Sequence, residues 1–199
     1  MPIDALAEIT DPAALQALPA RDRVLVTAAR LFYTEGVRAT GIDRVIAEAG
    51  VTKVTFYRHF PAKSDLVLAF LARRHERWMA WFTAALARHA RPAQPLRALV
   101  PALREWLGSP GFRGCAFINT VAELAGLQPE VLGVAQAHKA AMTAALAGLL
   151  PPGRGRAAQA QLLALGVDGA IVQAQGGAGA EPALRALALL VERLEAGPA

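Results

Sequence analysis

Residues 40–63 read TGIDRVIAEAGVTKVTFYRHFPAK, and this stretch predicts two short helices joined by a tight turn. Over 42–49 the apolar residues recur at the three-and-four spacing of one face of an α-helix. Gly50 follows at once, and glycine most readily adopts the left-handed backbone that ends a helix. Thr40 and Asp43 form a capping-box pattern, which we expect to start the first helix.

The second helix has its own signals. Thr52 is expected to cap its start, with Val51 and Phe56 placed as a hydrophobic staple. Phe56 and Phe60 lie four apart and predict its buried side, and Pro61 ends it. Its outward side and flanks carry the remaining residues: Lys53, Val54, Thr55, Tyr57, Arg58 and His59. A polar outward face is typical of a helix-turn-helix, whose second helix lies in the major groove of DNA.

Two motifs together resemble the DNA-binding domain of the TetR family of bacterial transcriptional regulators. The pattern AAxLFxxxG occupies 28–36, and AGVTKVTFYRHFPAKSDLV occupies 49–67. The resemblance implies that Lys53, Val54 and Thr55 approach base edges. Many relatives carry a smaller residue in place of Val54, and a valine can contact a thymine methyl group. The resemblance also implies phosphate or supporting DNA contacts from Thr40, Arg44, Thr52, Tyr57, Arg58, His59 and Lys63.

Basic charge is concentrated at this motif. Residues 21–63 hold eight Lys/Arg and four Asp/Glu, a net charge of +4 in 43 residues. Residues 64–199 hold 13 Lys/Arg and nine Asp/Glu, which is the same net charge of +4 spread over 136 residues. Residues 1–20 hold three acids and no base. This distribution favours a nucleic-acid partner for the motif.

Composition and spacing predict an all-α chain of about nine helices. Hydrophobic residues make up 54% of the chain and aromatic residues only 6%, so Ala, Leu and Val must build the core, which favours helices. We expect a flexible arm at 1–20, a three-helix DNA-binding domain at 21–66, and a helical effector-binding and dimerisation domain at 67–199. The longest helix is expected at 63–89. Later helices are expected at 96–107, 112–125, 130–150, 156–175 and 182–195.

Cysteine and hydropathy patterns place the chain in the cytoplasm. Cys115 is the single cysteine, so no internal disulfide can form. No uninterrupted apolar run of about 18 residues exists, and no signal-peptide layout opens the chain, so neither a membrane span nor secretion is expected. The four histidines lack metal-ligand spacing, and we expect no metal and no cofactor. A small enzyme with a Cys115 and His138 thiolate pair is disfavoured, since no acid or oxyanion-forming loop accompanies them.

A ligand site is predicted beyond the long helix. Asn119 and Glu123 lie four apart on an otherwise apolar helix, and aromatic residues could wall a cavity around them. The alternative, in which the aromatics are core and the polar pair faces solvent, stays open. The predicted ligand-binding residues are Trp78, Trp81, Trp106, Phe112, Phe117, Asn119 and Glu123.

The last two helices predict a homodimer. We expect them to carry more apolar side chains than one chain of this length can bury, and small residues among them would allow close approach. The predicted interface residues are Leu163, Val167, Ile171, Leu184, Leu187 and Val191. The sequence is therefore interpreted as a homodimeric regulator, a repressor that binds a pseudo-palindromic operator and is released by a small, mostly apolar effector. The alternative is a dimeric DNA-binding protein with a solid C-terminal core.

Overall fold

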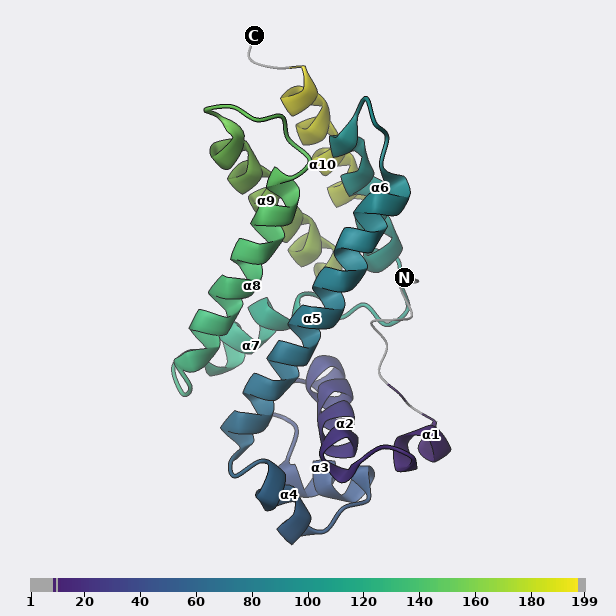
Figure 1. Cartoon of the computed structure of the whole chain (residues 1–199), viewed down its shortest axis with the longest axis vertical. Coiled ribbons are helices and arrows are strands. Elements are labelled where there is room, and N and C mark those ends of the chain that lie inside the picture. Colours follow the sequence, from purple (N-terminus) through teal and green to yellow (C-terminus); the bar gives the residue numbers. More distant parts are fainter. Residues whose placement is uncertain (1–8, 10, 197–199) are drawn as a thin grey trace. The chain divides into compact units, whose positions relative to one another are not determined.

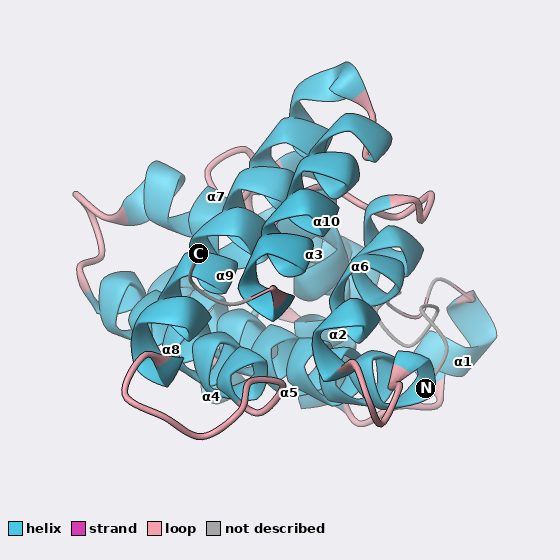
Figure 2. Cartoon of the chain, turned by 90° about the horizontal axis from the view of Figure 1, so that it is seen from above, coloured by secondary structure: helices cyan, strands magenta, loops and turns pink. Residues whose placement is uncertain are grey.

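A computed structural model describes residue 9 and residues 11–196. These residues form helices and loops without any strand, which confirms the predicted all-α fold (Figure 2). None of the described helices combines the length and the apolar content needed to cross a membrane. In chain order the elements are α1 (Pro12–Gln16), α2 (Ala20–Glu35), α3 (Ile42–Ala49), α4 (Lys53–His59), α5 (Lys63–His89), η2 (Pro95–Ala98), α6 (Leu99–Leu107), α7 (Ala116–Leu124), α8 (Glu130–Ala147), α9 (Arg156–Gln173), η3 (Ala174–Ala178) and α10 (Glu181–Glu195).

The chain divides into two compact units. The motif unit holds the described residues up to Arg77 together with Ala116–Ala135. The distal unit holds Trp78–Cys115 and the described chain from Gln136 onward. Helices α5 and α8 therefore each contribute to both units, whereas α7 belongs to the motif unit although it lies far along the sequence. The domain boundaries at 21–66 and 67–199 stay a prediction.

In the motif unit, α2, α3 and α4 pack around one apolar core (Figure 1). Phe56 of α4 and Val45 of α3 are fully buried, and Phe32 of α2 is almost so. The Phe32 ring meets the Phe70 ring of α5 edge to face, with centroids 5.6 Å apart. Phe56 thus anchors the short helix α4, which is too short to be stable alone.

The turn between α3 and α4 forms as the sequence predicts. Gly50 ends α3 in the left-handed conformation, with φ 62° and ψ 43°. Thr52 caps α4, because its Oγ1 accepts a hydrogen bond of 3.1 Å from the backbone N–H of Thr55. The capping box expected for α3 is wrong, since Gly41 is the N-cap and no side chain caps it. The Thr40 hydroxyl instead donates to the Gly36 carbonyl at 2.8 Å.

The distal unit is built on the pairing of α9 with α10 (Figure 1). A Cβ at Gly166 would lie 2.8 Å from a Leu190 methyl and 3.0 Å from a Leu187 methyl, so glycine permits this close helix approach. Arg104 of α6 donates to Glu181 of α10 at 2.8 Å and 3.1 Å, which ties the two helices at their surface. The six residues predicted for the dimer interface are buried within this chain: Leu163, Val167, Ile171, Leu184, Leu187 and Val191. A surface for a second copy therefore has to come from other residues.

The predicted N-terminal arm is only partly described, because residues 1–8 and 10 lie outside the described residues. The helical turn predicted after Asp11 is confirmed as α1. Asp11 caps it by accepting a hydrogen bond of 2.9 Å from the backbone N–H of Ala14.

Candidate nucleic-acid interface

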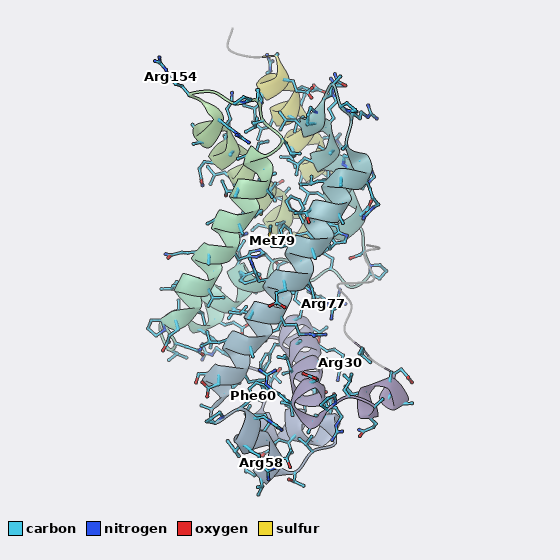
Figure 3. The ribbon with its side chains drawn as sticks, viewed as in Figure 1. Arg30, Arg58, Phe60, Arg77, Met79 and Arg154 are labelled. Atoms are coloured by element: carbon cyan, nitrogen blue, oxygen red, sulfur yellow. The ribbon has the colours of Figure 1, made fainter. Side chains whose placement is uncertain are left out.

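Helix α4 presents an outward face that combines apolar, aromatic and basic side chains. Val54 is 73% exposed, Tyr57 is 44% exposed, and Arg58 is also exposed. Arg58 projects from the outer side of the motif, whereas Phe60 lies inside it (Figure 3). The Phe56 ring packs edge to face on Tyr57 with centroids 5.1 Å apart, which fixes the direction of the tyrosine. The buried side of α4 thus holds its outward face rigid.

The first turn of α4 carries its polar groups close to the α3 helix. Lys53 Nζ lies 3.4 Å from Asp43 Oδ1, and both side chains are mostly exposed. Such an exposed pair is weak, so DNA phosphates can compete for the ammonium group. The Thr52 and Thr55 hydroxyls lie 2.9 Å apart and hydrogen-bond to each other. His59 ends the helix and is half-buried.

Two predicted phosphate ligands are instead tied into the motif unit. Thr40 is fully buried, so its hydroxyl is not presented to DNA. Lys63 donates to the Thr40 carbonyl at 2.7 Å, and its ammonium lies 6.0 Å from the centroid of the Phe32 ring. Burial lowers the pKa of Lys63, and the charge of Glu123 opposes that shift. Lys63 therefore connects the start of α5 to the loop before α3.

Arg44 lies in a chain of ion pairs on the surface of α2 and α3. Its guanidinium donates to Glu35 at 2.8 Å and to Glu48 at 2.8 Å, and Glu48 also pairs with Arg30. The hydrogen bond from Arg44 lowers the pKa of Glu35 and of Glu48. Because the guanidinium of Arg44 already pairs with the carboxylates of Glu35 and Glu48, it is less available to bind a phosphate.

Glu123, predicted to line a ligand cavity, contacts the loop between α2 and α3 instead. Its Oε2 accepts a hydrogen bond of 2.7 Å from the backbone N–H of Arg38. A second long-range bond runs the other way, from the side chain of Gln128, whose Nε2 donates to the carbonyl of Ser64 at 3.2 Å. The segment that carries α7 is thereby attached to two backbone positions that flank the helix-turn-helix, one in the loop before α3 and one at the start of α5.

The seven predicted ligand residues fall into both units and do not form one described site. Phe117 is buried in the motif unit, where Asn119 and Glu123 are half-buried. The three tryptophans and Phe112 gather in the distal unit as one cluster, whose rings meet edge to face or at a tilt. Its centroid distances are 5.4 Å for Trp78 and Trp106, 6.1 Å for Trp81 and Trp106, and 5.3 Å for Trp106 and Phe112. Phe82 and His138 complete this tryptophan cluster, at 4.6 Å and 5.1 Å from Trp78.

Two of these indoles leave a polar atom unsatisfied. Nε1 of Trp78 and Nε1 of Trp81 are buried and have no hydrogen-bond acceptor among the described residues. Buried polar groups are normally paired, because an unmade hydrogen bond is costly inside a protein. The tryptophan cluster therefore contains two buried N–H donors that lack an acceptor among the described residues.

Sequence reasoning missed one residue that positions the interface. Arg23 of α2 donates to the Ala49 carbonyl at 3.0 Å and to the Gly50 carbonyl at 3.4 Å. These are carbonyls at the end of α3, where a cation is favoured by the helix dipole. A long-range partner of this kind leaves no periodic signal in the sequence.

The fold and this outward face define a helix-turn-helix DNA-binding protein. Residues 24–70 match the family model described as "Bacterial regulatory proteins, tetR family". SCO4454, a TetR-family transcriptional regulator from Streptomyces coelicolor, is 37% identical, with a TM-score of 0.74 over 87% of this chain and 92% of that one. The chain therefore belongs to the TetR family of transcriptional regulators, a family of DNA-binding proteins that are not enzymes.

Other relatives agree on the family. A TetR transcriptional regulator from Chloroflexus aurantiacus is 25% identical, with a TM-score of 0.75 over 92% of this chain and 96% of that one. The HTH-type transcriptional activator FasR of Mycolicibacterium smegmatis is 34% identical over 95 residues, which are 47% of this chain and 43% of FasR. The matched segment thus spans less than half of that curated relative.

Proposed function

We propose that the chain is a homodimeric repressor that reads a pseudo-palindromic operator through α4 and is released by a small effector. The observation that supports this best is the outward face of α4, where Lys53, Val54 and Tyr57 project from a helix anchored by Phe56. Lys53 and Thr55 suit base edges, and Tyr57 and Arg58 suit phosphates. Val54 is placed to contact a thymine methyl group.

Selection of bound sequences from random duplex DNA tests this proposal. We expect a palindrome whose half-sites lie about 34 to 36 Å apart, one helical turn, because each subunit of a twofold dimer enters one major groove. A protein that prefers no selected sequence over random DNA at matched salt would contradict it. A reporter gene placed behind the selected site then separates repression from activation.

The dimer is supported by an exposed apolar stripe on α9. Leu162, Leu165 and Val172 are exposed and repeat at the spacing of one helix face, with the half-buried Gly169 between them. Leu189 of α10 is exposed as well. Apolar residues on the two terminal helices of a small chain favour association with a second copy. Sedimentation at micromolar concentration tests this, and a monomer with and without DNA would contradict it.

The effector is proposed to bind against the tryptophan cluster. The unpaired Nε1 atoms of Trp78 and Trp81 favour a mostly apolar molecule that carries a hydrogen-bond acceptor. Calorimetric screening of such compounds, with operator affinity measured in parallel, tests both binding and release. Trp78→Phe and Trp81→Phe should each weaken effector binding by about tenfold, because each removes one hydrogen bond between uncharged groups in an apolar site. A compound that binds without changing operator affinity would refute release.

A further inference from the structure

The rings of the tryptophan cluster are closed off from solvent, with one exception. The exposed fraction is 0 to 3% for the members carried on helices, which are Trp78, Trp81, Phe82, Trp106 and His138. A molecule in solution reaches these rings only if part of the surrounding chain moves aside. The segment whose movement costs least therefore determines how the cluster opens.

Phe112 is the exception. It is half-buried, and it lies on the loop between α6 and α7, whereas every other member of the cluster lies on α5, α6 or α8. Its ring meets the Trp106 ring edge to face. Moving a ring on a helix disturbs the packing of several turns, whereas a ring on a loop moves with a few residues. Phe112 is therefore the member that costs least to displace.

The loop that carries Phe112 is shaped by bonds of its own. The backbone N–H of Phe112 donates to the Ser109 carbonyl at 3.0 Å, and the Ser109 hydroxyl donates to the Trp106 carbonyl at 2.8 Å. Arg113 Nη1 donates to the carbonyl of Pro110 at 3.0 Å and to that of Phe112 at 2.7 Å. These bonds lie within the loop or at the end of α6, so they persist when the loop moves as one body.

Gly114 fixes the far end of this loop. It is buried with φ 84°, and the side-chain oxygen of Gln175 stands where a Cβ of residue 114 would lie. A residue with a side chain suits neither this backbone nor this space, so the chain is held tightly here. Residues 109–113 are exposed or half-buried. The loop thus has one fixed end and an outer part that has room to move.

We propose that residues 108–113 form a gate, and that outward movement of Phe112 opens the tryptophan cluster to small, mostly apolar molecules. Closure is favoured because the Phe112 ring buries apolar surface against Trp106. The open state needs only a small population, since a ligand can select a minor state of about 0.1 to 10%. As the entrance for an effector the gate rests on the proposed function, whereas the movement of the loop does not.

Hydrogen exchange in the full-length protein tests the gate without any effector. The Nε1–H groups of Trp78 and Trp81 are buried, so they exchange with water only when the cluster opens. Opening of a loop exposes little surface, and their exchange should hardly respond to low concentrations of urea. The backbone amide of Val167, in the core of α9, should respond steeply because it needs unfolding of the unit. An equally steep response of the indoles would overturn the gate.

Two truncations of apolar side chains separate the gate from general loss of stability. Phe112→Ala should speed exchange of both indoles by about two- to tenfold, the change in the closed-to-open ratio when one aromatic ring pair is lost. Val191→Ala, at a buried residue of α10, is the matched control. It should speed exchange of the Val167 amide and leave the indoles unchanged, because its contacts persist when the loop opens.

Unchanged indole exchange in Phe112→Ala would overturn the gate, and if that variant did not fold, the urea response of the wild type would still decide. Titrations with operator DNA test the proposed function separately. If the indoles open locally but no apolar compound alters operator affinity, the gate stands and the effector falls. If an effector is found and Phe112→Ala leaves its rates of binding and release unchanged, the effector stands and the gate is not its entrance.

Discussion

The backbone N–H of Arg38 donates a hydrogen bond of 2.7 Å to Glu123 Oε2, although 85 positions separate the two residues. The carboxylate also lies where a side chain at Gly36 would stand, 3.1 Å from a Cβ built there. Gly36 has φ 94°, a conformation that favours glycine, so the loop and the carboxylate fit each other closely. Helix α7 therefore holds the loop that precedes the helix-turn-helix.

The first prediction concerns this bond. Glu123→Leu removes the acceptor, so the Arg38 amide should exchange its hydrogen faster and operator affinity should fall by about fivefold, the low end of coupling between sites. Glu123→Gln keeps an acceptor oxygen and should behave much like the wild type. Hydrogen exchange and DNA titration measure the two effects. Unchanged exchange at Arg38 in Glu123→Leu would show that the bond does not hold the loop.

The second prediction concerns the turn of the motif. Gly50→Ala should destabilise the protein by about 1 to 2 kcal/mol, because a residue with a Cβ is strained in the left-handed region. The added Cβ would also lie 2.7 Å from Gln16 Nε2. Combining Gly50→Ala with Gln16→Ala should recover only the part of the lost stability that is due to this clash. Thermal unfolding measures both, and full recovery would mean that backbone strain contributes nothing.

The third prediction separates two lysines of the motif. Lys53→Ala should weaken specific DNA binding by about 1 to 3 kcal/mol and relax base preference, with little change in melting temperature. Lys63→Ala should lower stability by about 1 kcal/mol, because its ammonium bonds the Thr40 carbonyl inside the unit. Melting curves and binding titrations at several salt concentrations distinguish them. Asp43→Asn is the control for Lys53, and it should not weaken binding, since it frees the ammonium.

The fourth prediction concerns the proposed dimer. Leu165 is 62% exposed on α9, so Leu165→Glu should convert a dimer to monomer without loss of fold. Leu127→Glu, at an exposed leucine of the other unit, is the matched control and should leave the dimer intact. Sedimentation and circular dichroism provide the readouts. A Leu165→Glu dimer as tight as the wild type would place the interface elsewhere.

The fifth prediction concerns acid stability. The pKa values of Glu35 and Glu48 are lowered below 4.5 in the folded protein, chiefly by hydrogen bonds from Arg44. As the pH falls, the unfolded chain therefore binds protons before the folded protein does. The stability contributed by the two carboxylates is fully present above their ordinary pKa and is lost as the pH falls through the lowered pKa values. Arg44→Met should melt below the wild type at pH 7, and this gap should begin to narrow near about pH 4 and close only as the pH falls through the lowered pKa values. A gap independent of pH would exclude these carboxylates as its cause.

Local signals predicted the elements of the fold well. The long helix α5 covers 63–89 as expected, and Gly50 and Thr52 act as the turn chemistry requires. The predicted helix at 112–125 is shorter in the structure, where α7 is Ala116–Leu124. Gly114 adopts φ 84° just before it, which helical backbone does not allow.

Long-range contacts could not be predicted in this way. Thr40 and Lys63 look like DNA ligands in the sequence, yet the Thr40 hydroxyl donates to the Gly36 carbonyl and the Lys63 ammonium donates to the Thr40 carbonyl. Glu123 looks like a cavity residue, and its partner is a backbone amide far away in the chain. Arg74 is a charged residue of the long helix α5, yet it is buried with its guanidinium 4.0 Å from the centroid of the Tyr33 ring, a contact that no local pattern indicates.

The six residues predicted for the dimer interface are buried within the chain, while other apolar residues of the last two helices are exposed. Helix α9 has apolar side chains on two sides, and periodicity alone does not say which side meets the rest of the chain. Leu163, Val167 and Ile171 face the core, and the exposed stripe lies one position away, at Leu162 and Val172. Packing of α9 on α10 decides between the two faces.

The aromatic residues are divided between the units in a way that gives each its own optical signal. Trp78, Trp81 and Trp106 are the three tryptophans of the chain, and all belong to the distal unit. Tyr33 and Tyr57 are its two tyrosines, and both belong to the motif unit. Excitation at the red edge, where tyrosine does not absorb, would follow the distal unit alone, and tyrosine absorbance would follow the DNA-binding motif. The wild-type chain can thus report whether its two units melt together or in sequence, without any added label.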